Sequence, residues 1–147
     1  MTSLRTIAAA FAMALPAAAI AGTPIAVHRD PGCGCCEKWA AQVRAQFGRQ
    51  VQIIDDAARA AFSRRAGVPA DLVSCHTAII DGMTFEGHVP LADMKRVLAQ
   101  HPKGVTGLAV AGMPMGSPGM EMAGMKVQAY DVIAFGPGVR RVFAHHG

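Results

Sequence analysis

The sequence predicts an α/β fold, and three patterns support that class. Short runs of aliphatic and β-branched residues are typical of strands, the first at Ile25-Ala26-Val27 and the next at residues 51–54. Between these runs, Trp39, Val43 and Phe47 recur at every fourth position, which is the spacing of an amphipathic helix. Further along, an Asp-Gly pair between two strand-like runs indicates a hairpin. Strands that alternate with amphipathic helices favour a sheet covered by helices.

The elements of the first half follow one another closely. Turn residues Asp30-Pro31-Gly32 come after the first strand, and Gly48 ends the first helix. After the second strand, Asp55-Asp56 can cap a helix from Ala57 to Ala66, which Gly67 ends. The order up to this point is strand, helix, strand, helix.

A hairpin and a third helix complete the series. Asp81-Gly82 joins runs 77–80 and 83–86 and predicts a two-residue turn of type I′. After Pro90, apolar residues at helical spacing predict a helix; they are Leu91, Met94, Val97 and Leu98. Strand-helix-strand-helix-hairpin-helix is the order of a thioredoxin-like fold, in which a right-handed crossover makes the first two strands parallel.

The chain beyond Pro102 departs from this plan. Residues 104–124 are rich in Gly, Pro and Met and predict a long Met-rich loop. The runs Val127 to Phe135 and Val139 to Phe143, separated by Gly136-Pro137-Gly138, predict an added C-terminal hairpin.

Residues 1–21 predict a cleaved secretory signal peptide. A positive charge at Arg5 precedes an apolar run from Ile7 to Ala14, and the segment ends in Ala19-Ile20-Ala21. The run is too short to span a bilayer, so no membrane anchor is expected after cleavage. We therefore expect residues 22–147 to form one domain in the periplasm.

Charge and cysteine content narrow the function. The formal net charge of +4 comes from Lys and Arg residues that are scattered along the chain, which gives no support to nucleic-acid binding. All four cysteines lie after residue 21. Because the periplasm is oxidising, they must be paired with each other or protected by a metal.

Three of the thiols lie in Cys33-Gly34-Cys35-Cys36, at the junction of the first strand and the first helix. A helix N-terminus favours thiolates through the helix dipole. Cys33 and Cys36 have the spacing of a thiol-disulfide exchange motif, but Cys35 adds a third sulfur that suits a metal better. In a thioredoxin-like fold the loop before the third strand lies beside this helix, so Cys75 is expected to join the same site.

The second candidate feature is the segment 112–122, where thioethers stand on a backbone too rich in Gly and Pro for a helix. Thioether sulfur is a soft ligand that selects Cu(I), although Met also commonly fills gaps under loops. Imidazoles at the same edge of the sheet would let the site hold Cu(II) as well, although each histidine also fits a structural role. The expected copper ligands are therefore Cys33, Cys35, Cys36, Cys75, His76, His88, Met113 and Met115.

Four separated strings of the chain resemble the CopG-type periplasmic copper-resistance proteins, a family with a CxCC motif formerly catalogued as a domain of unknown function. The resemblance runs from about Ile25 to Phe143, and the strings are His28 to Cys36, Ser74 to Ala78, Glu86 to Pro90 and Gly112 to Met120. It implies a periplasmic, thioredoxin-like, copper-binding protein linked to copper export components and to interconversion of Cu(I) and Cu(II). It also implies that Cys33, Cys35 and Cys36 form the family's motif, with Cys75 as an additional thiol.

The expected function is thus to hold Cu(I) in a cluster of cysteine thiolates, with neighbouring sulfurs sharing more than one ion. The first alternative is a thiol-disulfide oxidoreductase in which Cys33 attacks a substrate disulfide and Cys36 resolves the intermediate. A binding module stapled by two disulfides and a zinc site of four thiolates are further alternatives.

Overall fold

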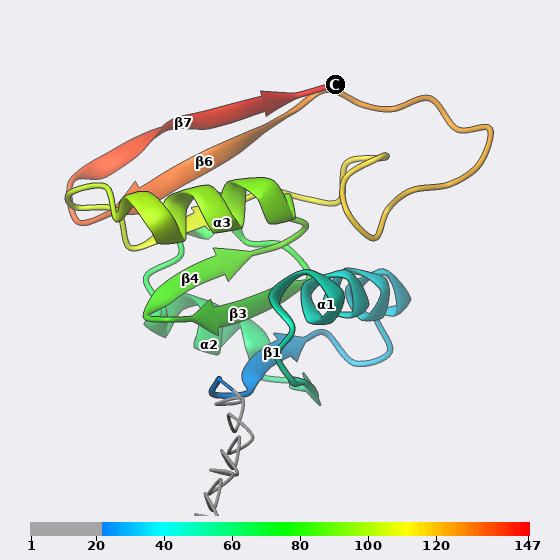
Figure 1. Cartoon of the computed structure of the whole chain (residues 1–147), viewed down its shortest axis with the longest axis horizontal. Coiled ribbons are helices and arrows are strands. Elements are labelled where there is room, and N and C mark those ends of the chain that lie inside the picture. The colour runs from blue at the N-terminus through cyan, green and yellow to red at the C-terminus, as the bar shows by residue number, and fades with distance from the viewer. Residues whose placement is uncertain (1–21) are drawn as a thin grey trace, which may run out of the picture.

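The computed structural model describes residues 22–147, which form a seven-stranded mixed sheet and three α-helices (Figure 1). The strand order in the sheet is β2-β1-β3-β4-β5-β6-β7. The strands are β1 (Ile25–Arg29), β2 (Val51–Asp55), β3 (His76–Ile80), β4 (Met83–Glu86), β5 (Gly107–Ala109), β6 (Tyr130–Gly136) and β7 (Val139–His146). The helices are α1 (Gly34–Phe47), α2 (Arg59–Arg65) and α3 (Leu91–Gln100), with a 3₁₀ turn at Ala70–Leu72.

The predicted signal peptide, residues 1–21, lies outside the described residues. Within residues 22–147, no helix combines the length and the apolar character that crossing a bilayer requires.

The first half of the chain confirms the predicted order of elements. β1 and β2 pair in parallel, with Val27 opposite Ile53. Helix α1 ends at Gly48, whose φ of 62° is left-handed and whose N–H donates to the carbonyl of Arg44. Helix α2 is shorter than the predicted range 57–66, and Asp56 accepts the N–H of Ala58 at 2.8 Å just before it begins.

The β3–β4 hairpin also matches the sequence pattern. Its strands pair antiparallel, with Ile80 opposite Met83. Asp81 and Gly82 have φ values of 49° and 80°, and a type I′ turn requires positive φ at both positions. The Asp-Gly pair therefore determines where the chain reverses.

The prediction of an unbroken loop over residues 104–124 is wrong at its beginning. Gly107–Ala109 form the buried strand β5, which pairs parallel with β4 and antiparallel with β6. Three residues are too few to show a strand period in the sequence. The segment becomes a strand because it fills the gap between two neighbours.

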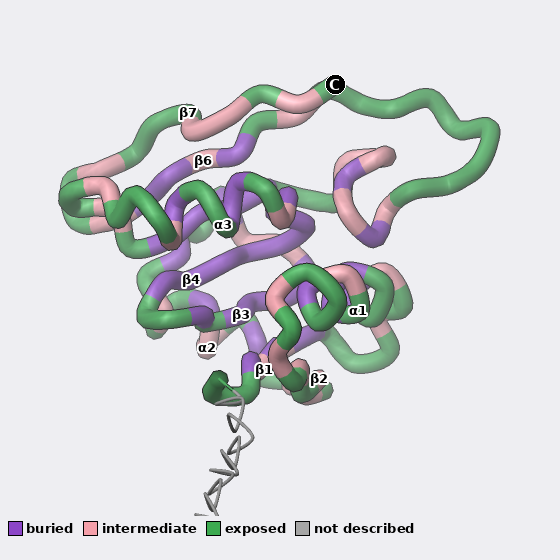
Figure 2. The backbone as a smooth tube through the Cα atoms, viewed as in Figure 1, coloured by how far each residue is buried: buried purple, intermediate pink, exposed green. Residues whose placement is uncertain are grey.

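The C-terminal hairpin is confirmed, with its turn directly after Gly136. Because β6 pairs with β5, this hairpin extends the main sheet instead of standing apart from it. The long Met-rich segment between β5 and β6, residues 110–129, leaves the sheet and returns to it. Figure 2 shows that the outer part of this segment is exposed, whereas β3 and β4 are mostly buried.

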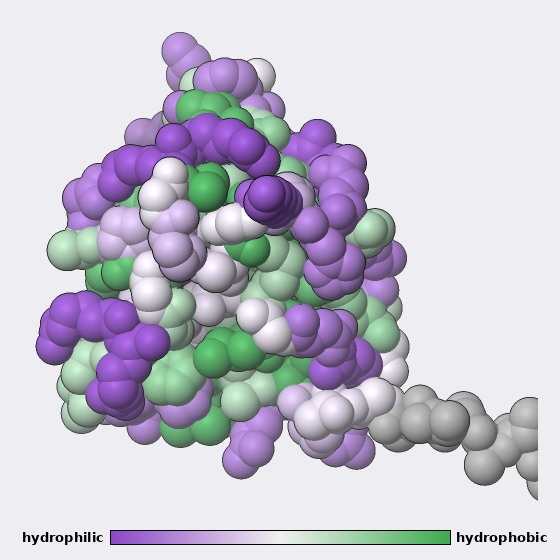
Figure 3. Space-filling model, turned by 90° about the vertical axis from the view of Figure 1, so that its left-hand side faces the viewer, coloured by the Kyte–Doolittle hydropathy of each residue, from purple (hydrophilic) through white to green (hydrophobic). Residues whose placement is uncertain are grey.

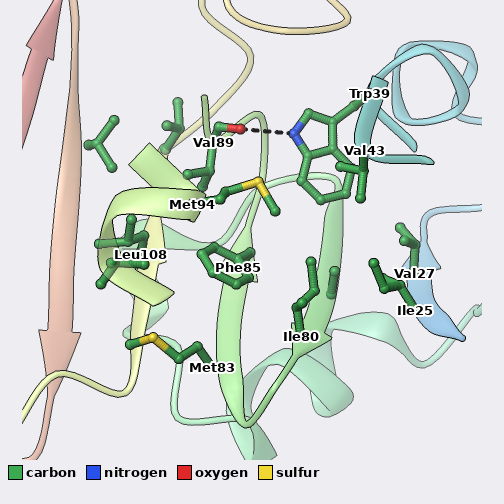
Figure 4. Packing of buried hydrophobic residues seen from close by; sticks show 14 of the residues in the cluster. Ile25, Val27, Trp39, Val43, Ile80, Met83, Phe85, Val89, Met94 and Leu108 are labelled. Atoms are coloured by element: carbon green, nitrogen blue, oxygen red, sulfur yellow. Dashed lines mark hydrogen bonds between the residues drawn. The ribbon is translucent and has the colours of Figure 1, made fainter. Parts of the chain in front are cut away.

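The main core lies between the sheet and the pair α1 and α3, which share one face of the sheet, while α2 lies on the other face (Figure 1). Its largest members include Trp39, Phe85, Met94 and Leu108, all fully buried (Figure 4). Burying each such side chain contributes about 1.5–3 kcal/mol. The indole N–H of Trp39 donates to the carbonyl of Val89 at 3.0 Å, so α1 is fixed against the segment that leads into α3.

Candidate metal centre

The topology of the sheet brings the candidate ligands to one edge. Strands β1, β4 and β5 run parallel to one another and β3 runs antiparallel to them, since β1 and β4 both pair antiparallel with β3. The carboxyl ends of three strands and the amino end of β3 therefore meet. Cys33 follows β1, Cys75 precedes β3, His88 follows β4 and Met113 follows β5.

The opposite edge of the molecule is different in character. Figure 3 shows that face, on which hydrophilic and hydrophobic residues are intermingled. Among the described residues, the groups of cysteine and histidine side chains close enough to hold a metal ion lie at the cysteine edge.

The four cysteine sulfurs form a single group, with every pair of Sγ atoms within 4.8 Å. Cys33 and Cys36 are joined by a disulfide bond, with their Cα atoms 5.4 Å apart. Cys35 and Cys75 are free thiols. Cys35 Sγ lies 3.3 Å from Cys33 Sγ, and Cys75 Sγ lies 3.4 Å from Cys36 Sγ.

Burial divides this cysteine group into an outer and an inner half. Cys33, the residue before α1, and Cys35 are partly exposed, whereas Cys36 and Cys75 are buried. Burial, together with the nearby Cys35 sulfur, raises the pKa of the Cys75 thiol to about 12. Without a metal, Cys75 is therefore protonated at neutral pH, and a bound cation would have to displace that proton.

A hydrogen bond at the Nδ1 atom of His88 turns its other ring nitrogen, Nε2, towards Cys75. Its Nδ1 lies 2.8 Å from the carbonyl oxygen of Pro118, and a carbonyl only accepts, so Nδ1 carries the proton. Nε2 is then unprotonated and lies 3.2 Å from Cys75 Sγ. Burial lowers the pKa of His88, which keeps the ring neutral. A neutral imidazole held through its far nitrogen is the usual form of a histidine metal ligand.

His76 lies on the inner side of the same group. Its Nδ1 is 3.5 Å from Cys75 Sγ, and the three side chains of Cys75, His76 and His88 bring their ligand atoms within 4.8 Å of one another. The ring is fully buried against Trp39, and its Nε2 has no hydrogen-bond partner in the described structure. Burial holds the pKa of His76 well below its usual value.

The two predicted methionines have different surroundings. Met113 Sδ lies 3.9 Å from Cys35 Sγ, and its side chain is 52% exposed. Met115 instead pairs with Gln128 across the loop, donating its N–H to the side-chain oxygen at 2.8 Å and accepting the Gln128 N–H at 2.9 Å. The structure therefore brings the Met113 sulfur against the thiols. The Met115 backbone is paired with Gln128 instead.

Close backbone packing holds the Met-rich loop over the cysteines. A Cβ added to Gly119 would lie 2.7 Å from the Cys35 carbonyl oxygen and 2.9 Å from the Trp39 nitrogen, so only glycine fits there. The Ser74 hydroxyl donates to the carbonyl of Gly112 at 2.5 Å, which ties the start of the loop to the Cys75 segment. A surface pocket lined in part by Cys75 and Met113 lies beside the Ser74–Gly112 attachment.

Sequence reasoning missed a buried ion-pair network beneath the cysteines. Glu86 is fully buried and accepts hydrogen bonds from Arg59, Ser63, Thr77 and the backbone N–H of Ser74. Burial raises its pKa, although these hydrogen bonds oppose the rise. Arg59 also donates to Asp30 at 2.7 Å, and Asp30 pairs through its main chain with both Cys33 and Cys75.

This Arg59–Glu86 network therefore fixes the distance between the two cysteine-bearing segments. Arg29 supports it by donating to the carbonyl of Cys33 at 2.8 Å and to Asp55 at 2.6 Å. Arg29 and Glu86 lie within strings that resemble the CopG-type proteins, but neither they nor Arg59 follow a metal-binding pattern. The signal in the sequence was Glu86 itself, a charged residue at the end of the strand-like run 83–86. His28, by contrast, contacts Asp56 and stacks on Phe62, away from the thiols.

The donor set fits a soft metal. When the Cys33–Cys36 disulfide is reduced, the site offers four thiol sulfurs, one thioether and one or two neutral imidazoles. Thiolates and thioethers select Cu(I), and imidazole also suits Cu(II). Hard ions such as Mg²⁺ and Ca²⁺ prefer oxygen ligands, which this group lacks.

Comparison with known proteins identifies relatives. Residues 72–120 match the family model described as "Protein of unknown function, DUF411". A comparison with curated proteins found no match. Two solved structures, "Copper resistance protein copG" in Form 1 and Form 2, are 42% and 41% identical to the chain, with TM-scores of 0.75 and 0.76. Each covers 84% of this chain, and the match takes in 96% and 98% of their own chains. Identity of this level over nearly the whole described structure means that the chain belongs to the family of the CopG copper resistance proteins.

Proposed function

We propose that this protein is a periplasmic copper-binding protein of copper resistance, which holds Cu(I) in a thiolate cluster of Cys33, Cys35, Cys36 and Cys75. The observation that carries the proposal is that these four sulfurs, from two segments about 40 residues apart in the chain, lie within 4.8 Å of one another. Four sulfurs so close together can bridge several soft ions, whereas four separate sites would each lack ligands.

The neighbours of the cluster extend its ligand set. Met113 approaches Cys35 from the exposed side, and His88 approaches Cys75 from the buried side. We assign these two residues as additional ligands, with His76 and Met115 as second candidates from the same segments. Thiolates favour Cu(I), whereas imidazole can bind copper in either oxidation state, so we propose that the site interconverts Cu(I) and Cu(II).

The order β1-α1-β2-α2-β3-β4-α3 supports a thioredoxin-like plan, with the cysteine motif at the N-terminus of α1. Strand β5, the Met-rich loop and the C-terminal hairpin are then additions to this plan, and of these the loop packs over the cysteines. The predicted signal peptide supports a periplasmic location, and the two related structures are copper resistance proteins. We therefore propose copper export components as the partners of this protein.

The Cys33–Cys36 disulfide favours a second candidate function, thiol-disulfide oxidoreductase activity. Cys33 is the more exposed of the pair and would attack a substrate disulfide, after which Cys36 would resolve the mixed disulfide. This function leaves Cys35, Met113 and His88 without a role, although all three surround the same sulfurs. Copper binding is therefore the function that the site supports best.

The test is copper loading of reduced protein without oxygen. We expect Cu(I) to be retained in stoichiometric amounts after desalting, with sulfur as the main ligand in X-ray absorption at the copper edge. A Cys35→Ala variant should retain less copper, because it removes the sulfur that lies between Cys33 and Met113. If reduced protein keeps no copper, and the Cys33–Cys36 dithiol instead reduces a model disulfide at catalytic rates, the oxidoreductase replaces the copper protein as the proposed function.

A further inference from the structure

The arrangement of the two free thiols around the disulfide is not explained by copper storage alone. Cys35 lies against Cys33, and Cys75 lies against Cys36, so each sulfur of the disulfide has its own free thiol at 3.3–3.4 Å. A storage cluster needs all four sulfurs reduced. A disulfide exchange enzyme needs only two of them.

Each free thiol also has a second copper ligand of its own. Cys35 has the thioether of Met113 at 3.9 Å, on the exposed side. Cys75 has the Nε2 atom of His88 at 3.2 Å, on the buried side. When Cys33 and Cys36 are joined, the site therefore keeps one thiol with a thioether and one thiol with an imidazole. Both pairs of ligands suit Cu(I).

Building on the proposed copper-binding function, we propose that the Cys33 and Cys36 thiols are the electron donors that reduce Cu(II), and that Cys35 and Cys75 retain the Cu(I) that forms. These roles follow from the positions of the cysteines. Cys33 and Cys36 are bonded to each other and supply the electrons, while the flanking free thiols Cys35 and Cys75 supply the ligands.

The reaction balances without another reactant. Each of the two thiols gives one electron, one sulfur–sulfur bond forms between Cys33 and Cys36, and both thiol protons go to solvent. Two Cu(II) ions accept these electrons and become two Cu(I) ions. A dithiol/disulfide couple transfers two electrons, so one reduced chain reduces two copper ions once. A further round requires an external dithiol to reduce the disulfide.

The number of ligands matches the number of electrons. Two Cu(I) ions are formed, and two thiols remain to hold them, since Cys35 and Cys75 are the free cysteines of this structure. The Arg59–Glu86 network and Asp30 hold the two cysteine-bearing segments in place from below. The disulfide can therefore form while the flanking thiols stay beside it.

The experiment is a titration of the fully reduced protein with Cu(II) in the absence of oxygen. The Cu(II) electron paramagnetic resonance signal, the free thiols and the position of any disulfide, mapped by alkylation and mass spectrometry, are measured at each step. We expect the signal of about two equivalents of Cu(II) to disappear with the loss of about two thiols per chain. The disulfide should map to Cys33–Cys36, and the copper should stay with the protein as Cu(I).

Two double variants with equal numbers of thiols separate specific from general thiol chemistry. Cys35→Ser with Cys75→Ser keeps the proposed donors, so Cu(II) should still be reduced, but the Cu(I) should be lost on desalting. Cys33→Ser with Cys36→Ser keeps Cys35 and Cys75 as ligands but removes the proposed electron donors, so it should reduce Cu(II) at least about tenfold more slowly. It should still retain part of the Cu(I) that is added directly, and less than the wild type because two of the four cluster sulfurs are gone. Circular dichroism checks that both variants are folded.

The outcomes distinguish this inference from the function on which it rests. If the wild-type protein does not retain Cu(I) added directly, the proposed copper-binding function fails. If it retains Cu(I) but the disulfide maps to another pair, or the two double variants reduce Cu(II) equally fast, the assignment of Cys33 and Cys36 as electron donors is wrong and copper binding stands.

Discussion

At the scale of single residues, the environment of each thiol sets its role. Cys75 is buried, has a raised pKa and faces an imidazole, whereas Cys35 is partly exposed and faces a thioether. The cysteine group thus contains an inner thiol that ionises with difficulty, Cys75, and an accessible outer thiol, Cys35. Under the proposed function, the outer position beside Met113 is where an arriving copper ion would first meet sulfur.

Met113→Leu tests this outer position. Leucine has nearly the same size but no ligand atom, so the affinity for Cu(I) should fall by about tenfold, or about 1.4 kcal/mol. Stability should change by less than about 0.5 kcal/mol, because the side chain is exposed. Competition with a chromophoric Cu(I) chelator measures the affinity.

Met122→Leu is the matched control for Met113→Leu. Met122 is 58% exposed and lies in the same loop, but no contact with the cysteine group is found for it among the described residues. Its replacement should leave the affinity unchanged. Equal losses of Cu(I) affinity in the two variants would show that Met113 is not a specific copper ligand.

At the scale of elements, the important contact is between the Met-rich loop and the N-terminus of α1. Gly119 lies against the backbone of Cys35 and Trp39, and Glu121 accepts hydrogen bonds from the Gly119 N–H and from Gln42 of α1. His88 holds the same part of the loop through the Pro118 carbonyl. The loop therefore positions Met113 and the tautomer of His88 at the same time.

Gly119→Ala should detach the loop from α1. The methyl group would collide with backbone atoms that cannot move aside, in addition to the cost of about 1–2 kcal/mol for alanine in left-handed conformation. We expect lower Cu(I) affinity and faster proteolytic cleavage within residues 110–129. Chelator competition and timed digestion measure the two effects.

Gly124→Ala provides the control for the conformational cost alone. Gly124 has a φ of 78°, close to the 85° of Gly119, but nothing lies within 4 Å of an added Cβ. It should lose some stability and keep its copper affinity. If Gly124→Ala weakens copper binding as much as Gly119→Ala does, contact with α1 is not what positions the ligands.

At the scale of the whole molecule, the fold buries titratable groups at the edge of the sheet. Burial lowers the pKa values of His76 and His88 below 6.5, so the folded protein binds their protons less readily than the unfolded chain. Their contribution to stability is present above pH 6.5 and is lost as pH falls through that value. Glu86 has a raised pKa and acts in the opposite direction, since its contribution is lost as pH rises above 4.5.

We therefore predict that the metal-free protein is less stable in mild acid and that His76 is a main cause. His76→Phe keeps a buried ring beside Trp39 but cannot be protonated. Between about pH 7 and about pH 5.5, the wild type should lose about 1 kcal/mol more of its free energy of unfolding than this variant. Urea unfolding at several pH values measures the difference, in which the Glu86 contribution cancels. Identical pH dependence in the two proteins would contradict the prediction.

Much of this architecture could be predicted from local patterns. The four-residue spacing of Trp39, Val43 and Phe47, and the Asp81-Gly82 pair, determine α1 and the β3–β4 turn through interactions close in the chain. β5 could not be predicted, because Gly107–Ala109 is a strand only by virtue of the neighbours on both sides. The buried positions of Glu86 and Arg59 could not be predicted for a similar reason, because each is stabilised in the interior by a partner distant in sequence.

The sequence by itself determined which chemistry is available: three cysteines at the start of a helix, a fourth before a later strand, and a loop rich in methionine. It also determined the order of strands and helices as far as α3, because hydrophobic periodicity and turn residues act over short distances. Only the tertiary structure decided that Cys35 faces Met113, that Cys75 faces His88 and that Cys33 bonds to Cys36. Those contacts depend on strand pairing and on the close approach of Gly119 to α1, which join residues that no local pattern connects.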